Sequence, residues 1–321
     1  METDSLPGDL EPQSLREELC FPFLARSQSP DGGWPYRLGN SSSVEPTCWA
    51  LLALGTPPST NRLDAIRHGC NWLRRVQHAD GSWPAYPGQP EGCWVTALAC
   101  LALQGQESNS EAVGKGMKWL CETWPAEASL WWRLQHRLFI RRKRIGIRQN
   151  PLLRGWSWTL GTSSWVEPTA YALLLLRHLP RHTWPRKAAR RWQMGEELLY
   201  DRMCLGGGWN AGNPMVYGVA GEPQMIPTIW ALLALQDSRQ CPENRRSLQW
   251  VERTCADIRA PASLALAHLC LQAYERPVPP LAPAIREWFA RNQFLGNVVT
   301  AAWVALALGP APRWLSPRSP Q

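Results

Sequence analysis

The chain has 321 residues, 45% of them hydrophobic, and a formal net charge of +8, so it is long enough for one large core or two ordinary domains. It shows no N-terminal signal peptide and no stretch of about 20 apolar residues, so we expect a cytoplasmic protein without a membrane span. The ten cysteines form no C-x-x-C pair and most fall within helical patterns, which indicates free core thiols in a reducing compartment rather than a disulfide framework.

One sequence motif recurs along the chain. A Gly-rich turn ends in Trp, a short polar stretch follows, and a nearly uncharged Ala/Leu helix begins. The turns lie at 28–34, 77–83, 155–158 and 206–209, and the helices that follow them lie at 44–54, 92–103, 166–176 and 226–235. Two weaker copies keep the helix without the turn, at 259–269 and 297–308. The copies start about 40 to 70 residues apart, a spacing that matches or exceeds the periods of helical repeats.

A second, amphipathic helix precedes each uncharged one. Its apolar residues recur at i, i+3 and i+4 with charges between them, which predicts one buried face, whereas the uncharged helices are predicted to be buried on all sides. The amphipathic segments lie at 15–24, 66–76, 113–120, 188–199, 247–255 and 285–289. A closed ring buries six inner helices behind six outer ones without leaving apolar ends. We therefore predict an all-α fold, a single α/α toroid over 1–321 with a basic insertion at about 125–155.

The residues of the Gly-Trp turns are typical of a structural role. Asp31 and Asp80 occupy positions where a carboxylate accepts backbone N–H bonds, and the glycines allow a positive φ. The Trp that ends each turn is expected to pack its ring beneath the turn against neighbouring helices. Pro and Thr recur at the starts of the inner helices, where Pro costs no hydrogen bond.

The insertion is strongly basic. From Trp131 to Arg154 it carries eight Lys or Arg and no acid, beside aromatic and aliphatic residues. Three interpretations remain open: a solvated insertion loop, peripheral contact of 131–154 with an anionic membrane, and nucleic-acid binding. Nucleic acid is the least favoured, because no recognised nucleic-acid motif is present.

Glu45 and Glu167 are the candidate catalytic residues. They occupy the same position in two repeats, directly before Pro-Thr, where inner helices of a ring point their N-termini at one end of the central cavity. The helix dipole favours a carboxylate there, while burial beside aromatic rings raises its pKa and favours the neutral acid, a proton donor. Helix capping alone is the alternative. Glu222 precedes the corresponding position of its own repeat by four residues and is expected at the same mouth.

Aromatic residues at inner-helix positions are the candidate substrate-binding groups. Their π faces can stabilise a cation by roughly 0.5 to 2 kcal/mol each, although packing between helix layers is the alternative for every one of them. With Glu222, the predicted binding residues are Trp49, Trp94, Tyr171, Trp230 and Trp303.

The turns Gln-Ser-Pro-Asp-Gly-Gly-Trp at 28–34 and Gln-His-Ala-Asp-Gly-Ser-Trp at 77–83 resemble the Q-x-x-x-G-x-W-type motifs of squalene-hopene cyclases. These belong to the terpenoid cyclase and protein prenyltransferase superfamily. The resemblance covers nearly the whole chain and implies an α/α barrel with a cavity suited to isoprenoids. Squalene cyclases are about twice as long, so the resemblance implies either an open cavity or a partner chain.

In class II terpene cyclases of that superfamily the acid is the middle Asp of D-x-D-D-T-A. Aligned on the Thr, Glu45 and Glu167 take its place. Ser43 and Pro46 replace the other two acids in one copy, and in the second copy Trp165 and Pro168 do so. The carboxylates that would tune the acid are therefore lost.

Metal and cofactor sites of the superfamily are not expected here. The D-x-C element that holds zinc in prenyltransferases is absent, and so is the D-D-x-x-D element of class I synthases. We interpret the histidines as forming no ligand pair, and so predict no metal and no cofactor.

The leading hypothesis is a terpenoid cyclase-like or prenyltransferase-like enzyme that acts on an isoprenoid of the squalene or prenyl diphosphate class. The alternatives are a non-catalytic toroid that binds isoprenoid or other apolar small molecules, and a protein-interaction scaffold that docks through its basic segment. Replacing Glu45 and Glu167 by Gln would separate an enzyme from a binder.

Overall fold

The computed structural model describes residues 12–57, 59–106, 110–138, 149–278 and 280–315. Six inner helices match the predicted uncharged segments, and six outer elements match the amphipathic ones. The inner helices are α3 (Val44–Leu54), α5 (Val95–Gln106), α9 (Val166–His178), α11 (Met225–Ala234), α13 (Pro261–Ala273) and α15 (Val298–Ala307). The outer elements are α1 to α2 (Pro12–Leu15, η1 Arg16–Cys20, Phe21–Arg26), α4 (Leu63–Val76), α6 (Glu111–Glu122), α10 (Ala188–Asp201), α12 (Pro242–Thr254) and α14 (Ala282–Asn292).

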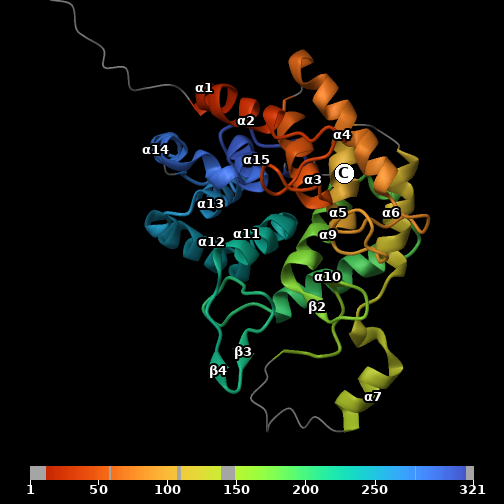
Figure 1. Ribbon diagram of the computed structural model, residues 1–321. Coiled ribbons are helices and arrows are strands. Elements are labelled where there is room, and N and C mark those ends of the chain that lie inside the picture. Colours follow the sequence, from red (N-terminus) through yellow and green to blue (C-terminus); the bar gives the residue numbers. More distant parts are fainter. Residues whose placement is uncertain (1–11, 58, 107–109, 139–148, 279, 316–321) are drawn as a thin grey trace, which may run out of the picture.

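The inner helices close into a ring. Each contacts the next along the chain, and α15 returns to pack against α3 (Figure 1). The α/α toroid predicted from the repeats is therefore confirmed. Nearly every residue of α3 is buried, whereas α4 buries only one face, through Ile66, Trp72, Leu73 and their neighbours. This difference reflects the absence of charge in the inner helices and the alternation of charge in the outer ones. From the closure we infer that the ring is one domain.

A hydrogen-bond clamp ties each Gly-Trp turn to the inner helix that follows it. The backbone N–H of the Trp donates to the Oγ1 of a buried Thr near the start of that helix, at 2.8–3.0 Å. The four pairs are Trp34–Thr47, Trp83–Thr96, Trp156–Thr169 and Trp209–Thr228. The indole N–H of each Trp donates to a leucine carbonyl of an outer helix, so each clamp joins both layers of the ring.

The Asp of the turn has the structural role that the sequence predicts. Asp31 accepts the N–H of Gly33 at 3.0 Å, the hydroxyl of Ser42 at 2.7 Å and the indole N–H of Trp72 at 2.9 Å. Gly32 has φ +94°, and a Cβ there would lie 2.9 Å from the carbonyl oxygen of His68. Only glycine fits this close approach of the turn to α4.

Within the described residues, two hairpins and the helix α7 stand outside the ring pattern. The pairs β1 (Trp156–Ser157) with β2 (Ser164–Trp165) and β3 (Met215–Val216) with β4 (Val219–Ala220) lead into α9 and α11. The predicted basic insertion begins with a helix, α7 (Leu130–Leu138), which projects from the ring, and 139–148 lie outside the described residues (Figure 1). Among the described helices, none is both long and apolar enough to cross a membrane.

We predict that Thr96→Val weakens the fold by about 1–3 kcal/mol, because valine keeps the shape of threonine but leaves the buried N–H of Trp83 without its acceptor. Denaturant unfolding measures this loss. In the control Thr183→Val, an exposed hydroxyl that donates to Pro180 is removed, and the loss should stay below about 0.5 kcal/mol. Equal losses in the two variants would contradict a stabilising role for the clamp.

Candidate functional site

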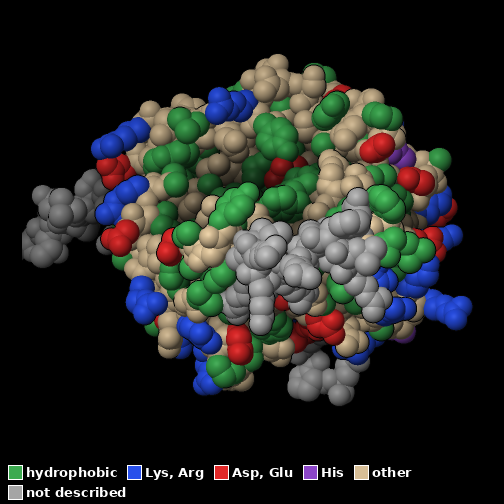
Figure 2. All heavy atoms as spheres, turned by 90° about the horizontal axis from the view of Figure 1, so that it is seen from below, with side chains coloured by type: hydrophobic (Ala, Val, Ile, Leu, Met, Phe, Trp, Pro, Cys, Tyr) green, Lys and Arg blue, Asp and Glu red, His purple; other side chains and the backbone are tan. Residues whose placement is uncertain are grey.

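The inner helices begin at one end of the ring, which we call the mouth. The hairpins that lead into α9 and α11 lie on the lower side of Figure 1, and Figure 2, seen from below, shows a hollow with hydrophobic side chains around it and acidic side chains inside it. Exposed apolar residues occur in the loops that enter the inner helices. They include Tyr36, Leu38, Tyr86, Leu160, Tyr217 and Val219.

The clamp decides which side chains face the interior. Thr47 of α3 points to the outer turn, where its hydroxyl meets Trp34. Glu45 and Trp49 stand two residues to either side, so they are four apart and share the opposite face of the helix, with Glu45 nearer the mouth. The same spacing in α9 relates Glu167 and Tyr171 to Thr169. Two carboxyl groups therefore lie at the mouth, each with an aromatic ring one turn deeper.

Among the residues that the structure describes, Tyr36 is the hydrogen-bond partner of Glu45, and its hydroxyl donates to Oε2 of the carboxylate. Burial raises the pKa of Glu45, and the Tyr36 bond opposes that rise. The indole of Trp49 also lowers the pKa by its proximity, although its N–H makes no hydrogen bond of ordinary length and angle.

Glu167 makes no hydrogen bond within the described part of the chain. Burial raises its pKa to about 7, with a further contribution from the charge of Glu45. The ring thus brings the two predicted acids within electrostatic reach of each other. Burial raises the pKa of both carboxyls, and because the charge of Glu45 adds to the rise at Glu167, Glu167 is the candidate to hold a proton up to about pH 7.

The predicted aromatic residues form one cluster. Trp49 stacks on Trp230 with ring centroids 5.2 Å apart, and Tyr171 lies 5.1 Å from Trp230. Trp303 meets Trp49 edge to face at 5.7 Å, and Trp94 stacks on Tyr171 at 5.3 Å. The structure therefore brings all five together.

The cluster forms an aromatic layer in the interior of the ring. Trp49 and Trp230 are fully buried, so their rings pack between helices and against each other. The indole N–H groups of Trp49, Trp230 and Trp303 have no acceptor among the described residues. The layer therefore combines π faces with unused donors.

Two members of the site carry no sequence signal. Tyr36 lies in the polar stretch between the turn and α3, and Trp314 comes from η8 (Arg313–Leu315), where it packs 6.3 Å from Trp49. Tyr36 stands two residues after its turn Trp, and the residues at this position in the other repeats have no hydroxyl group. Trp314 lies after the last repeat, and the closed ring brings it to Trp49. Glu222 is exposed between β4 and α11, and makes no hydrogen bond or ion pair with the described site residues. Its role remains a prediction.

The histidine spacing needs a correction. His178 and His182 stand four residues apart, which is the spacing of a helical ligand pair. However, α9 ends at His178 and His182 lies in the separate turn η4 (Arg181–Thr183), so the two do not share a helix face. Within the ranges that the structure describes, no group of three or more potential ligands that could hold a metal ion occurs.

Comparison with known proteins supports a resemblance to terpenoid cyclases over the first part of the chain. Residues 10–137 match the squalene-hopene cyclase C-terminal domain family. A squalene–hopene cyclase from Zymomonas mobilis is 32% identical over 121 residues, which are 34% of this chain and 18% of that protein. The chain thus aligns with less than a fifth of this curated relative. The resemblance to terpenoid cyclases is confirmed.

Solved structures confirm the fold along most of the chain. The type II terpene cyclase MstE from Scytonema superposes with a TM-score of 0.59 at 13% identity, covering 93% of this chain and 98% of MstE. A variant of MstE in complex with its substrate, geranylgeranyl dihydroxybenzoate, superposes with a TM-score of 0.58 at 13% identity, covering 95% of this chain and 97% of the variant.

We predict a pH-dependent stability that Glu167 causes. Between about pH 4.5 and 7 the unfolded chain releases the proton of Glu167 while the folded chain keeps it, so stability falls as pH rises through this range. Relative to Glu167→Gln, the wild type should lose about 2 kcal/mol from pH 4.5 to 8 in denaturant unfolding. Glu91→Gln, an exposed change in the loop before α5, should follow the wild type. A curve for Glu167→Gln parallel to that of the wild type would refute the burial of a neutral Glu167.

Proposed function

We propose that the protein binds an isoprenoid or a similar apolar chain at the mouth and transfers a proton to it from Glu167, as a terpenoid cyclase-like enzyme. The observation that carries the proposal is the pair of interacting carboxyl groups, Glu45 and Glu167, one turn above Trp49 and Tyr171. Acid and cation-stabilising rings are the two groups that proton-initiated cyclisation requires.

The two acids have different parts in this scheme. Glu167 holds the proton, and its transfer to an alkene carbon forms a C–H bond and leaves a carbocation above the aromatic layer. The bond from Tyr36 favours the ionised form of Glu45, and a negative charge there favours a cation nearby. The π faces of the layer contribute roughly 0.5–2 kcal/mol each to such a cation.

The apolar surroundings suit an isoprenoid chain. Hydrophobic side chains surround the hollow in Figure 2, and MstE, which shares the fold, was solved with a geranylgeranyl compound as its substrate. With 13% identity this likeness supports the cavity type rather than the particular substrate.

One observation favours a non-catalytic binder instead. A carboxyl group with a pKa of about 7 is a weaker acid than an ordinary glutamic acid, and alkenes accept protons poorly. The acids that flank the donor in the superfamily motif are replaced by Ser43 and Pro46 before α3 and by Trp165 and Pro168 before α9. A protein of this kind would retain the same ligand without turning it over.

The basic insertion fits contact with a lipid surface. The first turn of α7 exposes Leu130 and Trp131, at 82% and 67%, together with Arg133. Exposed Leu and Trp beside Arg are typical of interfacial helices that dock on anionic leaflets. We keep this docking as a secondary part of the proposal.

The direct test is product analysis by gas chromatography and mass spectrometry after incubation with squalene and with geranylgeranyl diphosphate. Glu167→Gln should lower turnover by about 100-fold or more, because glutamine cannot donate the proton, while Glu91→Gln should leave turnover unchanged. Turnover of the wild type should also fall as pH rises through about 7, where Glu167 ionises.

Ligand retention separates the two candidate functions. If the wild type forms no product but carries isoprenoid through purification, and Glu167→Gln carries it equally, the binder is supported and the enzyme is rejected. If the wild type neither converts nor retains any of these compounds, both candidates fail.

A further inference from the structure

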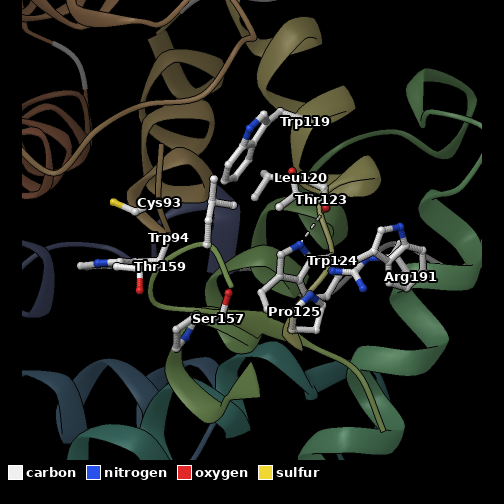
Figure 3. Close-up of a pocket in the computed structure, with 13 residues that line it drawn as sticks. Cys93, Trp94, Trp119, Leu120, Thr123, Trp124, Pro125, Ser157, Thr159 and Arg191 are labelled. Carbon is white, nitrogen blue, oxygen red and sulfur yellow. Dashed lines mark hydrogen bonds between the residues drawn. The ribbon is translucent and has the colours of Figure 1, made fainter. Parts of the chain in front are cut away.

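A further pocket lies between the residues before α5, the end of α6 and the first residues of α10, and its lining includes Pro168, the neighbour of Glu167. Four indoles line it, from Trp94, Trp119, Trp124 and Trp156 (Figure 3). Its polar lining includes the hydroxyls of Ser157 and Thr159 and the guanidinium of Arg191. The proposed reaction uses none of these polar groups.

Arg191 is the unusual member of this lining. Its side chain is fully buried, with the guanidinium 4.4 Å from the ring centroid of Trp124 and 4.1 Å from that of Trp156. One Nη2–H donates to the carbonyl of Gly155 at 2.9 Å. Nε and Nη1 have no acceptor among the described residues, and no described carboxylate forms an ion pair with this arginine. A buried cation with unused donors is costly unless an anion compensates it.

Comparison of the repeats explains how the pocket arises. In the first two repeats, the side chain of the glutamine six residues before the Trp lies between the turn and the next outer helix, where Arg191 lies in the third repeat. Gln28 donates to the carbonyls of Gly32 and Ala65, and Gln77 donates to those of Gly81 and Ala112, all at 2.9 Å. These glutamines bridge the turn to the next outer helix without any charge.

The third repeat lacks this bridge. Asn150 stands six residues before Trp156, and its side-chain oxygen accepts the N–H of Leu152 in its own turn. Arg191 lies four residues before Gly195, as Ala65 lies four before Gly69 and Ala112 four before Gly116. Each of these glycines packs under its own turn Trp, which establishes the equivalence. Arg191 therefore bonds the third turn from the outer helix, at the carbonyl of Gly155, one residue nearer the Trp than the carbonyls that the glutamines bond. It brings a positive charge and additional donors to this position.

The surroundings of the pocket are positive. Arg154 lies 5.5 Å from the ring of Trp124, on which Arg191 also packs. Burial and the neighbouring charges of Arg133 and Arg190 lower the pKa of Arg154. Glu127 is the acid that counteracts them, and its Oε1 is already engaged by the N–H of Ser164 at 2.8 Å. The local excess of arginine favours a ligand with more than one negative charge.

We propose that this pocket binds a phosphate group, with Arg191 as the main ligand and the hydroxyls of Ser157 and Thr159 as further donors in the lining. The planar guanidinium fork matches phosphate oxygens, and the dianionic charge matches the two arginines that share Trp124. Trp124 is only half-buried and its indole makes no hydrogen bond within the described residues, so it can move aside for the ligand. The proposal stands independently of the proposed enzyme activity.

The phosphate belongs either to a free ion or to an amphiphile. Trp94 lines this pocket and also stacks on Tyr171 of the aromatic layer, so an apolar chain attached to the phosphate would find apolar surface beside it. Inorganic phosphate, dodecyl phosphate and dodecanol distinguish these sources. All three are titrated in phosphate-free buffer by calorimetry and by tryptophan fluorescence.

The key variant is Arg191→Gln, which gives the third repeat the neutral amide of the first two. It should weaken phosphate binding by about 10- to 100-fold, the range expected when a charged hydrogen-bond donor is removed. The matched control is Arg186→Gln, an exposed change just before the same helix with the same loss of charge, which should bind as the wild type does. Melting temperature should rise with phosphate in the wild type and in the control, but not in Arg191→Gln.

Each outcome decides the proposal. Binding of inorganic phosphate that Arg191→Gln abolishes supports a free ion, and binding of dodecyl phosphate alone supports an amphiphile. The proposal is wrong if dodecanol binds as well as dodecyl phosphate, if Arg191→Gln binds phosphate as tightly as the control, or if the wild type binds neither phosphate. Should Arg191→Gln fail to fold, the double variant Ser157→Ala/Thr159→Ala should weaken binding by about 3- to 10-fold, and unchanged affinity would refute the site.

Discussion

The hydrogen bond from the turn Trp to the inner-helix Thr is the constraint on which the site depends. It fixes the rotation of α3 and α9 about their axes, because a Thr held against the outer turn forces the residues two positions before and after it toward the interior. Glu45 and Trp49 follow from Thr47 in this way, and Glu167 and Tyr171 follow from Thr169. Ring closure by α15 against α3 then brings side chains from separate repeats together.

Most of the fold could be predicted because the charge pattern within each repeat segment indicates how that segment is buried. Inner segments such as 44–54 carry almost no charge, and outer segments such as 66–76 alternate charge at helical spacing, so burial can be inferred without any knowledge of neighbours. The structure within the basic insertion is harder to predict from the sequence. The composition predicts an insertion at about 125–155 but does not show that Leu130–Leu138 form the helix α7, because an exposed amphipathic helix and a charged loop share much of their composition.

The site was predictable only where it follows the repeat. Glu45, Glu167 and four of the five aromatic residues occupy helix positions with fixed orientation, and Trp94 stands directly before α5, so their convergence could be expected. Tyr36 and Trp314 reach the same centre from irregular segments, and their contacts depend on loop geometry that periodicity does not encode. Arg191 was missed for a different reason. Its significance lies in the glutamine that the third repeat has lost, and the compensating residue is more than 40 positions further along the chain.

The central claim is that Glu167, beside Glu45, keeps its proton up to about pH 7. The most direct measurement is an NMR titration of the protein with 13C-labelled glutamate carboxyl groups, in the wild type and in Glu167→Gln. One carboxyl resonance that titrates near pH 7 in the wild type and is missing from the variant is the predicted result. If every glutamate resonance titrates between about 4 and 5, as in unperturbed peptides, the mouth holds two ordinary carboxylates and the assignment of Glu167 as the proton donor is wrong.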